Sequence, residues 1–260
     1  MKRFLPVYAS AAYLFLYLPL IVLALFSFNS SKVAIWRGFT WDWYANVFRS
    51  EALLEGTMNS LIIAASTTIV CAILGTLAGY ALWKRQAPAL TTSLYLSLLT
   101  PEIVTGVSLL AFFEWIFRFL HVQLGMHTVV LAHISFSLVY VVIVILARLR
   151  TFDASLEEAA LDLGANEWQV FRHVTLPMLL PGIIAAALLC FTVSFDDYVI
   201  TSLVAGVNSE TLPMMIYAMA RRGVSPEVNA LSVMITIALG VLILIAGRLE
   251  QTRAPEARSS

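Results

Sequence analysis

The sequence predicts an all-α, polytopic membrane protein with six transmembrane helices and a helical insertion on the cytoplasmic side. Of its 260 residues, 60% are hydrophobic and only 12% are charged, whereas a soluble domain is about 45–50% apolar and about 25% charged. The apolar residues gather in stretches of about 20, the length of a helix that crosses a bilayer. Sixteen basic and sixteen acidic residues give a net charge of zero, and this balance argues against nucleic-acid binding.

Six apolar segments are long enough to span a membrane. They cover residues 8–28, 58–83, 92–120, 127–147, 178–200 and 227–247. The first is longer than the apolar core of a signal peptide, about 7–15 residues, so we expect a retained helix. Pro101 lies inside the third and predicts a kink or a helix break. Before the sixth, Ser225, Pro226 and Glu227 provide a cap, a proline at the first helical position and an acid in the first turn.

Lysine and arginine residues in the connecting segments predict the orientation of the chain. With the N-terminus in the cytoplasm, the inner segments hold ten of these sixteen residues and the outer segments hold six, including Arg221 and Arg222. We therefore expect both termini in the cytoplasm. The first outer loop contains Trp36, Trp41 and Trp43, whose rings favour the headgroup level, so this loop is expected to lie along the outer surface.

Residues 151–177, between the fourth and fifth spans, do not read as a plain loop. Ser155 and Glu158 have the spacing of a capping box, Gly164 stands where a helix commonly ends with positive φ, and Asn166 can cap a second helix. Both short helices are amphipathic and must bury an apolar face on the membrane surface or on a protein. Because anionic headgroups would repel the acidic first helix, a protein partner fits better.

A fixed pattern of residues runs through this insertion: Glu158, Ala159, Ala160, Gly164, Val174, Leu176 and Pro177. It resembles the EAA motif of ABC importer permeases, EAA-x3-G-x9-I-x-LP, with valine in place of isoleucine. Three further segments, SFNSSK from Ser27, FDDYVITSLVAG from Phe195 and ETLPMMIYAMARRGVSPEVNALS from Glu210, are similar to the second permease subunits of spermidine/putrescine importers. Because these segments are spread along the sequence, the resemblance extends over nearly the whole chain.

The resemblance implies the type I ABC importer permease fold and a place in a bacterial inner membrane. The six positions identical to the motif would then couple the permease to an ATPase. The implied partners are a homologous second permease subunit, an ATPase homodimer docking on residues 153–174, and an extracytoplasmic substrate-binding protein. The sequence has no phosphate-binding G-x-x-x-x-G-K-[ST] pattern, so we expect no enzyme activity and no cofactor on this chain, with ATP and Mg²⁺ on the partner ATPase.

Acidic residues inside predicted spans mark candidate substrate sites, since a charge at mid-membrane costs at least about 2.5 kcal/mol. Glu102 follows Pro101, while Asp196, Asp197 and Tyr198 lie near the outer end of the fifth span. Carboxylates beside aromatic rings suit a diamine or polyamine, because carboxylates pair with ammonium groups and rings hold the methylene stem. Consecutive helical residues diverge in direction, so we expect one aspartate, Asp197, to face the pathway.

Structural roles compete with this interpretation. Asp196 and Asp197 can instead cap the following segment or pair with Arg221 or Arg222, and Glu102 can satisfy amides freed by the proline. The histidines and cysteines show no metal-ligand spacing, so packing or polar roles are expected. The competing function is an ATP-independent secondary transporter or channel for a cationic solute, which would explain the acids but leaves the EAA-like segment without a role.

Overall fold

The computed structural model describes residues 4–32, 35–120, 122–221, 223 and 226–253. Within these ranges the chain is helical apart from turns, loops and one isolated bridge. The elements are α1 (Phe4–Phe26), α2 (Asp42–Arg49), α3 (Glu51–Arg85), α4 (Pro88–Leu98), α5 (Glu102–Leu120), α6 (Met126–Leu149), α7 (Ser155–Asp162), α8 (Glu167–Val170), the π-helical turn η1 (Phe171–Thr175), α9 (Leu176–Asp196), α10 (Val199–Val204), α11 (Leu212–Arg221) and α12 (Pro226–Arg253).

Six helices in the described part of the chain are long and apolar enough to cross a membrane. They are α1, α3, α5, α6, α12 and the continuous helix that runs from α8 through η1 to the end of α9. The prediction of an all-α protein with six transmembrane helices is confirmed. The chain divides into two compact units, one of Met1–Glu55 and Met215–Thr252 and one of Gly56–Met214 and Arg253–Ser260.

In the first unit, the tryptophan-rich loop after α1 is held by backbone and aromatic contacts. Asn29 and Phe39 form the isolated antiparallel bridge, and the Trp43 indole donates a hydrogen bond to the Asn29 carbonyl oxygen at 2.7 Å. The Phe28 ring stacks on Phe39 with centroids 5.1 Å apart. These contacts give the loop a defined shape, while its place at the outer membrane surface stays a prediction.

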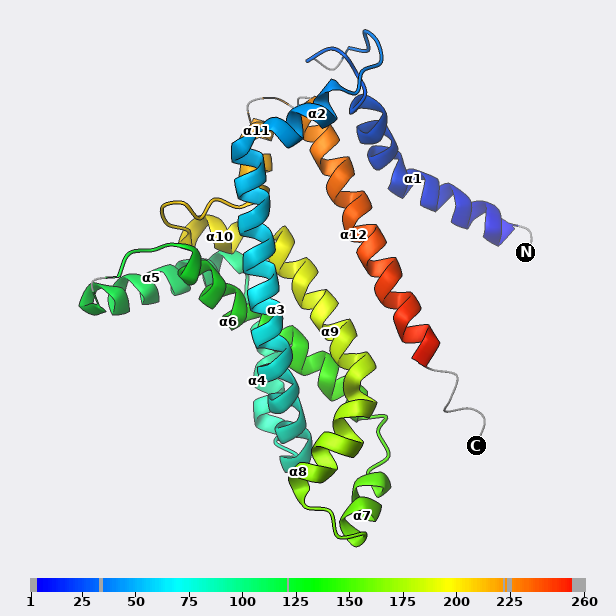
Figure 1. Cartoon of the computed structure of the whole chain (residues 1–260), viewed down its shortest axis with the longest axis vertical. Coiled ribbons are helices and arrows are strands. Elements are labelled where there is room, and N and C mark those ends of the chain that lie inside the picture. The colour runs from blue at the N-terminus through cyan, green and yellow to red at the C-terminus, as the bar shows by residue number, and fades with distance from the viewer. Residues whose placement is uncertain (1–3, 33–34, 121, 222, 224–225, 254–260) are drawn as a thin grey trace. The chain divides into compact units, whose positions relative to one another are not determined.

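The core of the second unit is built on α6, which packs against α3 and α9 (Figure 1). Cys71 of α3, Ile145 of α6 and Cys190 of α9 are all fully buried in this cluster. Close approach of α3 to α6 requires glycine: a Cβ on Gly75 would lie 2.6 Å from the Val141 side chain. Small residues four positions apart allow such packing between membrane helices. The insertion with α7 and α8 lies at one end of this unit (Figure 1).

The third predicted span is two helices rather than one. α4 ends at Leu98 and α5 begins at Glu102, so only Glu102–Leu120 is long enough to cross the membrane. Pro101 lacks a backbone N–H and disfavours the helical conformation at Thr100, which explains the break. The hydrogen bonds at the new start come from Thr105, whose amide and hydroxyl both donate to the Pro101 carbonyl oxygen.

The fifth predicted span, 178–200, begins earlier and ends earlier than expected. Its helix runs from Glu167 to Asp196, and the Leu176 amide donates to the Phe171 carbonyl oxygen in the wide π-helical turn. This turn ends two residues before Pro177, whose missing N–H would interrupt a regular hydrogen-bond ladder. The helix therefore continues past the proline into the insertion.

Local sequence signals set two other helix starts. The Asn166 side chain accepts a hydrogen bond from the Gln169 amide at 2.9 Å, and the Gln169 side chain accepts one from the Asn166 amide at 2.9 Å, so the predicted cap of α8 is confirmed. Pro226 is the first residue of α12 and Glu227 lies in its first turn. The predicted cap of that helix, Ser225, lies outside the described residues.

Candidate functional site

A cavity of about 520 Å³ lies in the second unit, beside two helix breaks. One break separates α4 from α5 and the other separates α9 from α10. Every residue predicted for the substrate path lines this cavity: Glu102, Asp196, Asp197 and Tyr198. Residues almost a hundred positions apart in the sequence therefore share one space, together with Phe136 and Tyr140 of α6.

The two helix breaks explain why polar groups reach this cavity. Asp197 follows the last residue of α9 and has an extended backbone, with φ −69° and ψ 126°. Glu102 is the first residue of α5 and is exposed. Broken helices at a binding site also occur in secondary transporters, so the breaks alone do not select the class of transport.

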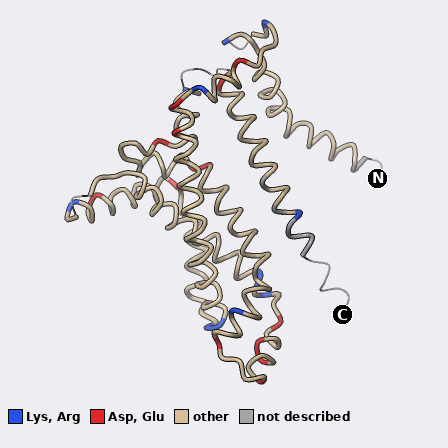
Figure 2. Tube along the Cα trace, viewed as in Figure 1, with Lys and Arg blue, Asp and Glu red and all other residues tan. Residues whose placement is uncertain are grey.

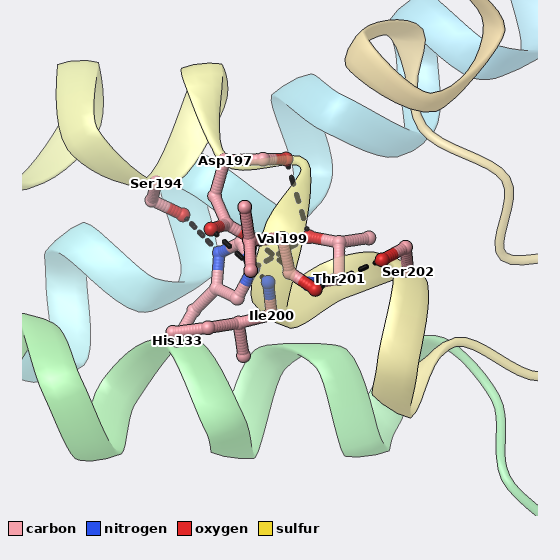
Figure 3. Close-up of polar contacts among 7 residues, drawn as sticks. All are labelled: His133, Ser194, Asp197, Val199, Ile200, Thr201 and Ser202. Carbon is pink, nitrogen blue, oxygen red and sulfur yellow. Dashed lines mark hydrogen bonds and ion pairs between the residues drawn. The ribbon is translucent and has the colours of Figure 1, made fainter. Parts of the chain in front are cut away.

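Asp197, the aspartate expected to face the pathway, lines the cavity, but its carboxylate is held by hydrogen bonds within the chain. Its side chain is only 7% exposed. Its carboxylate accepts hydrogen bonds from the Thr201 amide at 2.8 Å and the Thr201 hydroxyl at 2.7 Å, and from the Ile200 amide at 3.4 Å (Figure 3). These bonds fit the competing interpretation, in which Asp197 caps the segment that follows it, here α10. Asp196, by contrast, is exposed.

A buried histidine joins the three helices around this cap (Figure 3). His133 of α6 is 1% exposed; its Nδ1 lies 2.7 Å from the Ser194 hydroxyl and its Nε2 lies 2.9 Å from the Thr201 hydroxyl. Nε2 is also 3.4 Å from Asp197 Oδ2. The signal for this residue in the sequence was a polar side chain in the middle of an apolar span, and its partners were not foreseeable. Of the two arginines predicted as alternative partners of the aspartates, Arg221 donates to the Tyr217 hydroxyl at 3.1 Å, and Arg222 lies outside the described residues.

The insertion begins with a cap that differs from the prediction. The Ser155–Glu158 capping box is wrong: Ser155 is already the first residue of α7, and its amide donates to Asp153 Oδ1 at 3.0 Å. Hydrogen bonds from the Ser155 side chain and backbone lower the pKa of the Asp153 carboxyl below its usual value. Asp153 thus takes the capping role predicted for Ser155, and the Glu158 side chain is exposed.

The residues that match the EAA pattern lie mostly on the surface of the insertion. Glu158, Ala159, Gly164 and Pro177 are exposed, and Ala160 and Leu176 are half-buried. Gly164 has φ +89°, as predicted for the residue that ends a helix. A Cβ on Gly164 would meet nothing within 4 Å, so backbone conformation, and not space, favours glycine here.

The neighbouring acid, Glu157, is the buried one, and sequence reasoning missed it. Its side chain is 3% exposed and forms an ion pair with Lys84 at the end of α3. Its Oε1 accepts hydrogen bonds from the Tyr80 hydroxyl at 3.2 Å and from the Thr175 hydroxyl. The partners on α3 lie more than 70 residues away along the chain, so no local pattern could have identified Glu157 as the buried acid.

Comparison with known proteins decides between the classes of transporter. Residues 71–255 match the family of binding-protein-dependent transport system inner membrane components. The chain belongs to this family. The permease is accordingly a multi-pass inner-membrane component of an ABC transporter that works with an ATPase and a binding protein, and ATP hydrolysis belongs to a separate subunit. The ATP-independent alternative is thereby excluded.

Relatives cover most of the permease. It is 42% identical over 239 residues to the putrescine transport system permease protein PotI of Escherichia coli, covering 89% of this chain and 85% of PotI. It is 39% identical over 237 residues to the spermidine/putrescine transport system permease protein PotC of Haemophilus influenzae, covering 89% of this chain and 91% of PotC.

Solved structures confirm the ABC importer permease fold. A chain of a bacterial ABC transporter that imports the acidic polysaccharide alginate matches with a TM-score of 0.73 and 17% sequence identity, covering 97% of both chains. A chain of the MetNI methionine ABC transporter matches with a TM-score of 0.62 and 17% identity, covering 78% of this permease and 98% of that chain.

Proposed function

We propose that this permease forms half of the translocation pathway of an importer for polyamines such as putrescine and spermidine. The cavity carries the proposal, because it gathers the exposed acids Glu102 and Asp196 with the rings of Tyr198, Tyr140 and Phe136. A polyamine presents ammonium groups on a methylene chain; carboxylates pair with the ammonium groups, and aromatic rings attract the cations and cover the chain. The names of the PotI and PotC relatives support the same substrates.

The other half of the pathway belongs, in this proposal, to a homologous second permease subunit. The termini lie in the cytoplasm, as the excess of lysine and arginine on that side indicates. An ATPase homodimer docks on residues 153–174, and an extracytoplasmic binding protein delivers the polyamine. Exposed apolar side chains on the insertion support docking, since Leu163 is 90% exposed and Trp168 is 63% exposed beside the exposed acid Glu158.

The substrate proposal is tested by uptake of radiolabelled putrescine and spermidine in cells that express the complete transporter. Asp196→Asn and Glu102→Gln remove one charge each while keeping side-chain shape. A hydrogen bond to a charged group contributes about 1.5–3 kcal/mol, so each change is expected to lower uptake roughly tenfold to a hundredfold at limiting substrate. Glu114→Gln is the matched control, because Glu114 lies on the same helix as Glu102 but lines a different cavity.

Two results would contradict the substrate proposal. Absence of polyamine uptake in the wild type would remove the substrate assignment. If both cavity variants import polyamine at the wild-type rate, with the transporter present in normal amounts, the substrate does not pass through this cavity.

The docking proposal has its own test. Glu158→Arg combined with Gly164→Pro reverses an exposed charge and removes the positive φ at the corner. We expect the ATPase subunit to be lost when the complex is purified, and uptake to stop. Survival of uptake would show that this segment is not where the ATPase docks.

A further inference from the structure

A buried carboxylate ties the insertion to the membrane helices. Glu157 lies in the first turn of α7, with an ion pair to Lys84 and hydrogen bonds from the Tyr80 and Thr175 hydroxyls. Lys84 and Tyr80 belong to the last turns of α3, and Thr175 closes η1 immediately before α9. One side chain of α7 therefore contacts two other elements of the second unit, α3 and η1.

The charges of this cluster suit the helix ends that carry them. An acid in the first turn of α7 faces unpaired amides, and a base in the last turn of α3 faces unpaired carbonyl groups. Aromatic contacts surround the cluster: the Tyr80 ring lies 4.9 Å from the Phe171 ring, and Lys84 Nζ lies 5.4 Å from the centre of the Trp83 ring. Figure 2 shows basic and acidic residues together at this end of the unit. The carboxylate of the ion pair is thus buried among packed side chains, while the Lys84 side chain is 46% exposed.

We infer that Glu157 is a positioning residue that clamps α7 to α3 and α9, so that a displacement of α7 moves both membrane helices with it. A buried carboxylate that loses its partners is strongly unfavourable, so the cluster holds together or breaks as a whole. α9 begins next to Thr175 and ends at Asp196 in the wall of the cavity. The clamp therefore connects the cytoplasmic insertion to the cavity through one continuous helix.

This inference rests on the proposed docking of the ATPase on the insertion, and adjacent residues separate the two roles. Glu157 and Glu158 have the same chemistry, but the first is buried against the membrane helices and the second is exposed on the outer face of α7. Glu157 would transmit motion within the permease, whereas Glu158 would contact the ATPase. Variants of the two residues should fail in different ways.

The test compares Glu157→Gln with Glu158→Gln in complete transporter complexes reconstituted in proteoliposomes with the binding protein. We expect Glu157→Gln to retain the ATPase subunit and to hydrolyse ATP, while the ATP hydrolysed per putrescine or spermidine molecule imported rises at least about fivefold. For Glu158→Gln we expect loss of ATPase subunit on purification, with hydrolysis and uptake falling in the same proportion. An unchanged ratio in Glu157→Gln would overturn the clamp.

A second comparison needs no substrate. Lys84→Gln leaves the Glu157 carboxylate buried without its cation, and adding Glu157→Gln removes that charge. The double variant is therefore expected to melt at a higher temperature than Lys84→Gln alone. If the two changes lower the melting temperature by additive amounts, the clamp is overturned. This result counts even if the wild type imports no polyamine. Full ATPase retention and uptake by Glu158→Gln would instead count against the proposed docking.

Discussion

The polar cluster around His133 allows a quantitative prediction for the substitution His133→Ala. The imidazole contacts the Ser194 hydroxyl through Nδ1 and the Thr201 hydroxyl and Asp197 carboxylate through Nε2. Ser194 is 4% exposed and Thr201 is fully buried, so neither hydroxyl gains water in exchange. Each buried group left without its partner costs about 1–3 kcal/mol, and we expect a total loss of about 2–4 kcal/mol because Thr201 keeps its bond to Asp197.

Thermal unfolding of the purified complex measures this loss. A loss of 1 kcal/mol lowers the melting temperature by about 2–4 °C for a chain of 150–250 residues, so a decrease of roughly 5–15 °C is expected. A thiol-reactive fluorophore reports unfolding, because Cys71 and Cys190 are both fully buried in the folded chain. The partner subunits are used in cysteine-free form.

Two conservative variants separate the contacts of the ring. Asn in place of His133 can present an amide near the position of Nδ1, and Gln can present one near that of Nε2. Each is expected to recover part of the loss. If His133→Ala melts within about 1 °C of the wild type, the variant has not lost the stability expected when buried polar groups lose their partners. The reasoning is then refuted.

Three further predictions concern backbone positions and one cap. Gly164→Ala should destabilise the insertion by about 1 kcal/mol, because φ is +89°, and Gly164→Asn should cost less; amide hydrogen exchange of the insertion measures both. Gly79→Ala places a Cβ 2.8 Å from an α6 side chain, and it should lower the melting temperature by an amount corresponding to about 1–3 kcal/mol. Gly240→Ala is the control and should not lower the melting temperature, because a Cβ there would meet nothing within 4 Å. The pKa of Asp153 is lowered from 3.8, so its contribution to α7 is present above about pH 4 and is lost as the pH falls through its folded value; exchange at the start of α7 should then rise relative to Asp153→Asn, which keeps an acceptor without the charge.

Features set by local chemistry could be predicted from the sequence. The six spans follow from the length of the apolar stretches, the positive φ from Gly164, and the start of α8 from Asn166. The break before α5 follows from Pro101, which removes a donor and restricts the residue before it. In each case the physical cause lies within a few residues of its effect.

Features set by distant partners could not be predicted. The chain around Asp197 has no glycine or proline to announce a break, and α9 ends there where the carboxylate binds amides of α10 beside the buried His133. Glu157 and Glu158 are adjacent and have the same chemistry, but Glu157 is buried against partners that include Lys84 of α3, and Glu158 is exposed. Sequence reasoning therefore selected acids that line the cavity, but it did not foresee that α10 would hold the Asp197 carboxylate while Asp196 is exposed.

The corner at Gly164 has a mechanical consequence. Its shape is set by one backbone angle and by the reciprocal bonds of Asn166 and Gln169, and a side chain added to the glycine would touch no neighbour. Because these determinants are all local, the tip keeps the same outline whatever arrangement the membrane helices adopt. The tip can therefore move as one rigid piece, and the buried Glu157 carboxylate at its base joins that piece to the membrane helices.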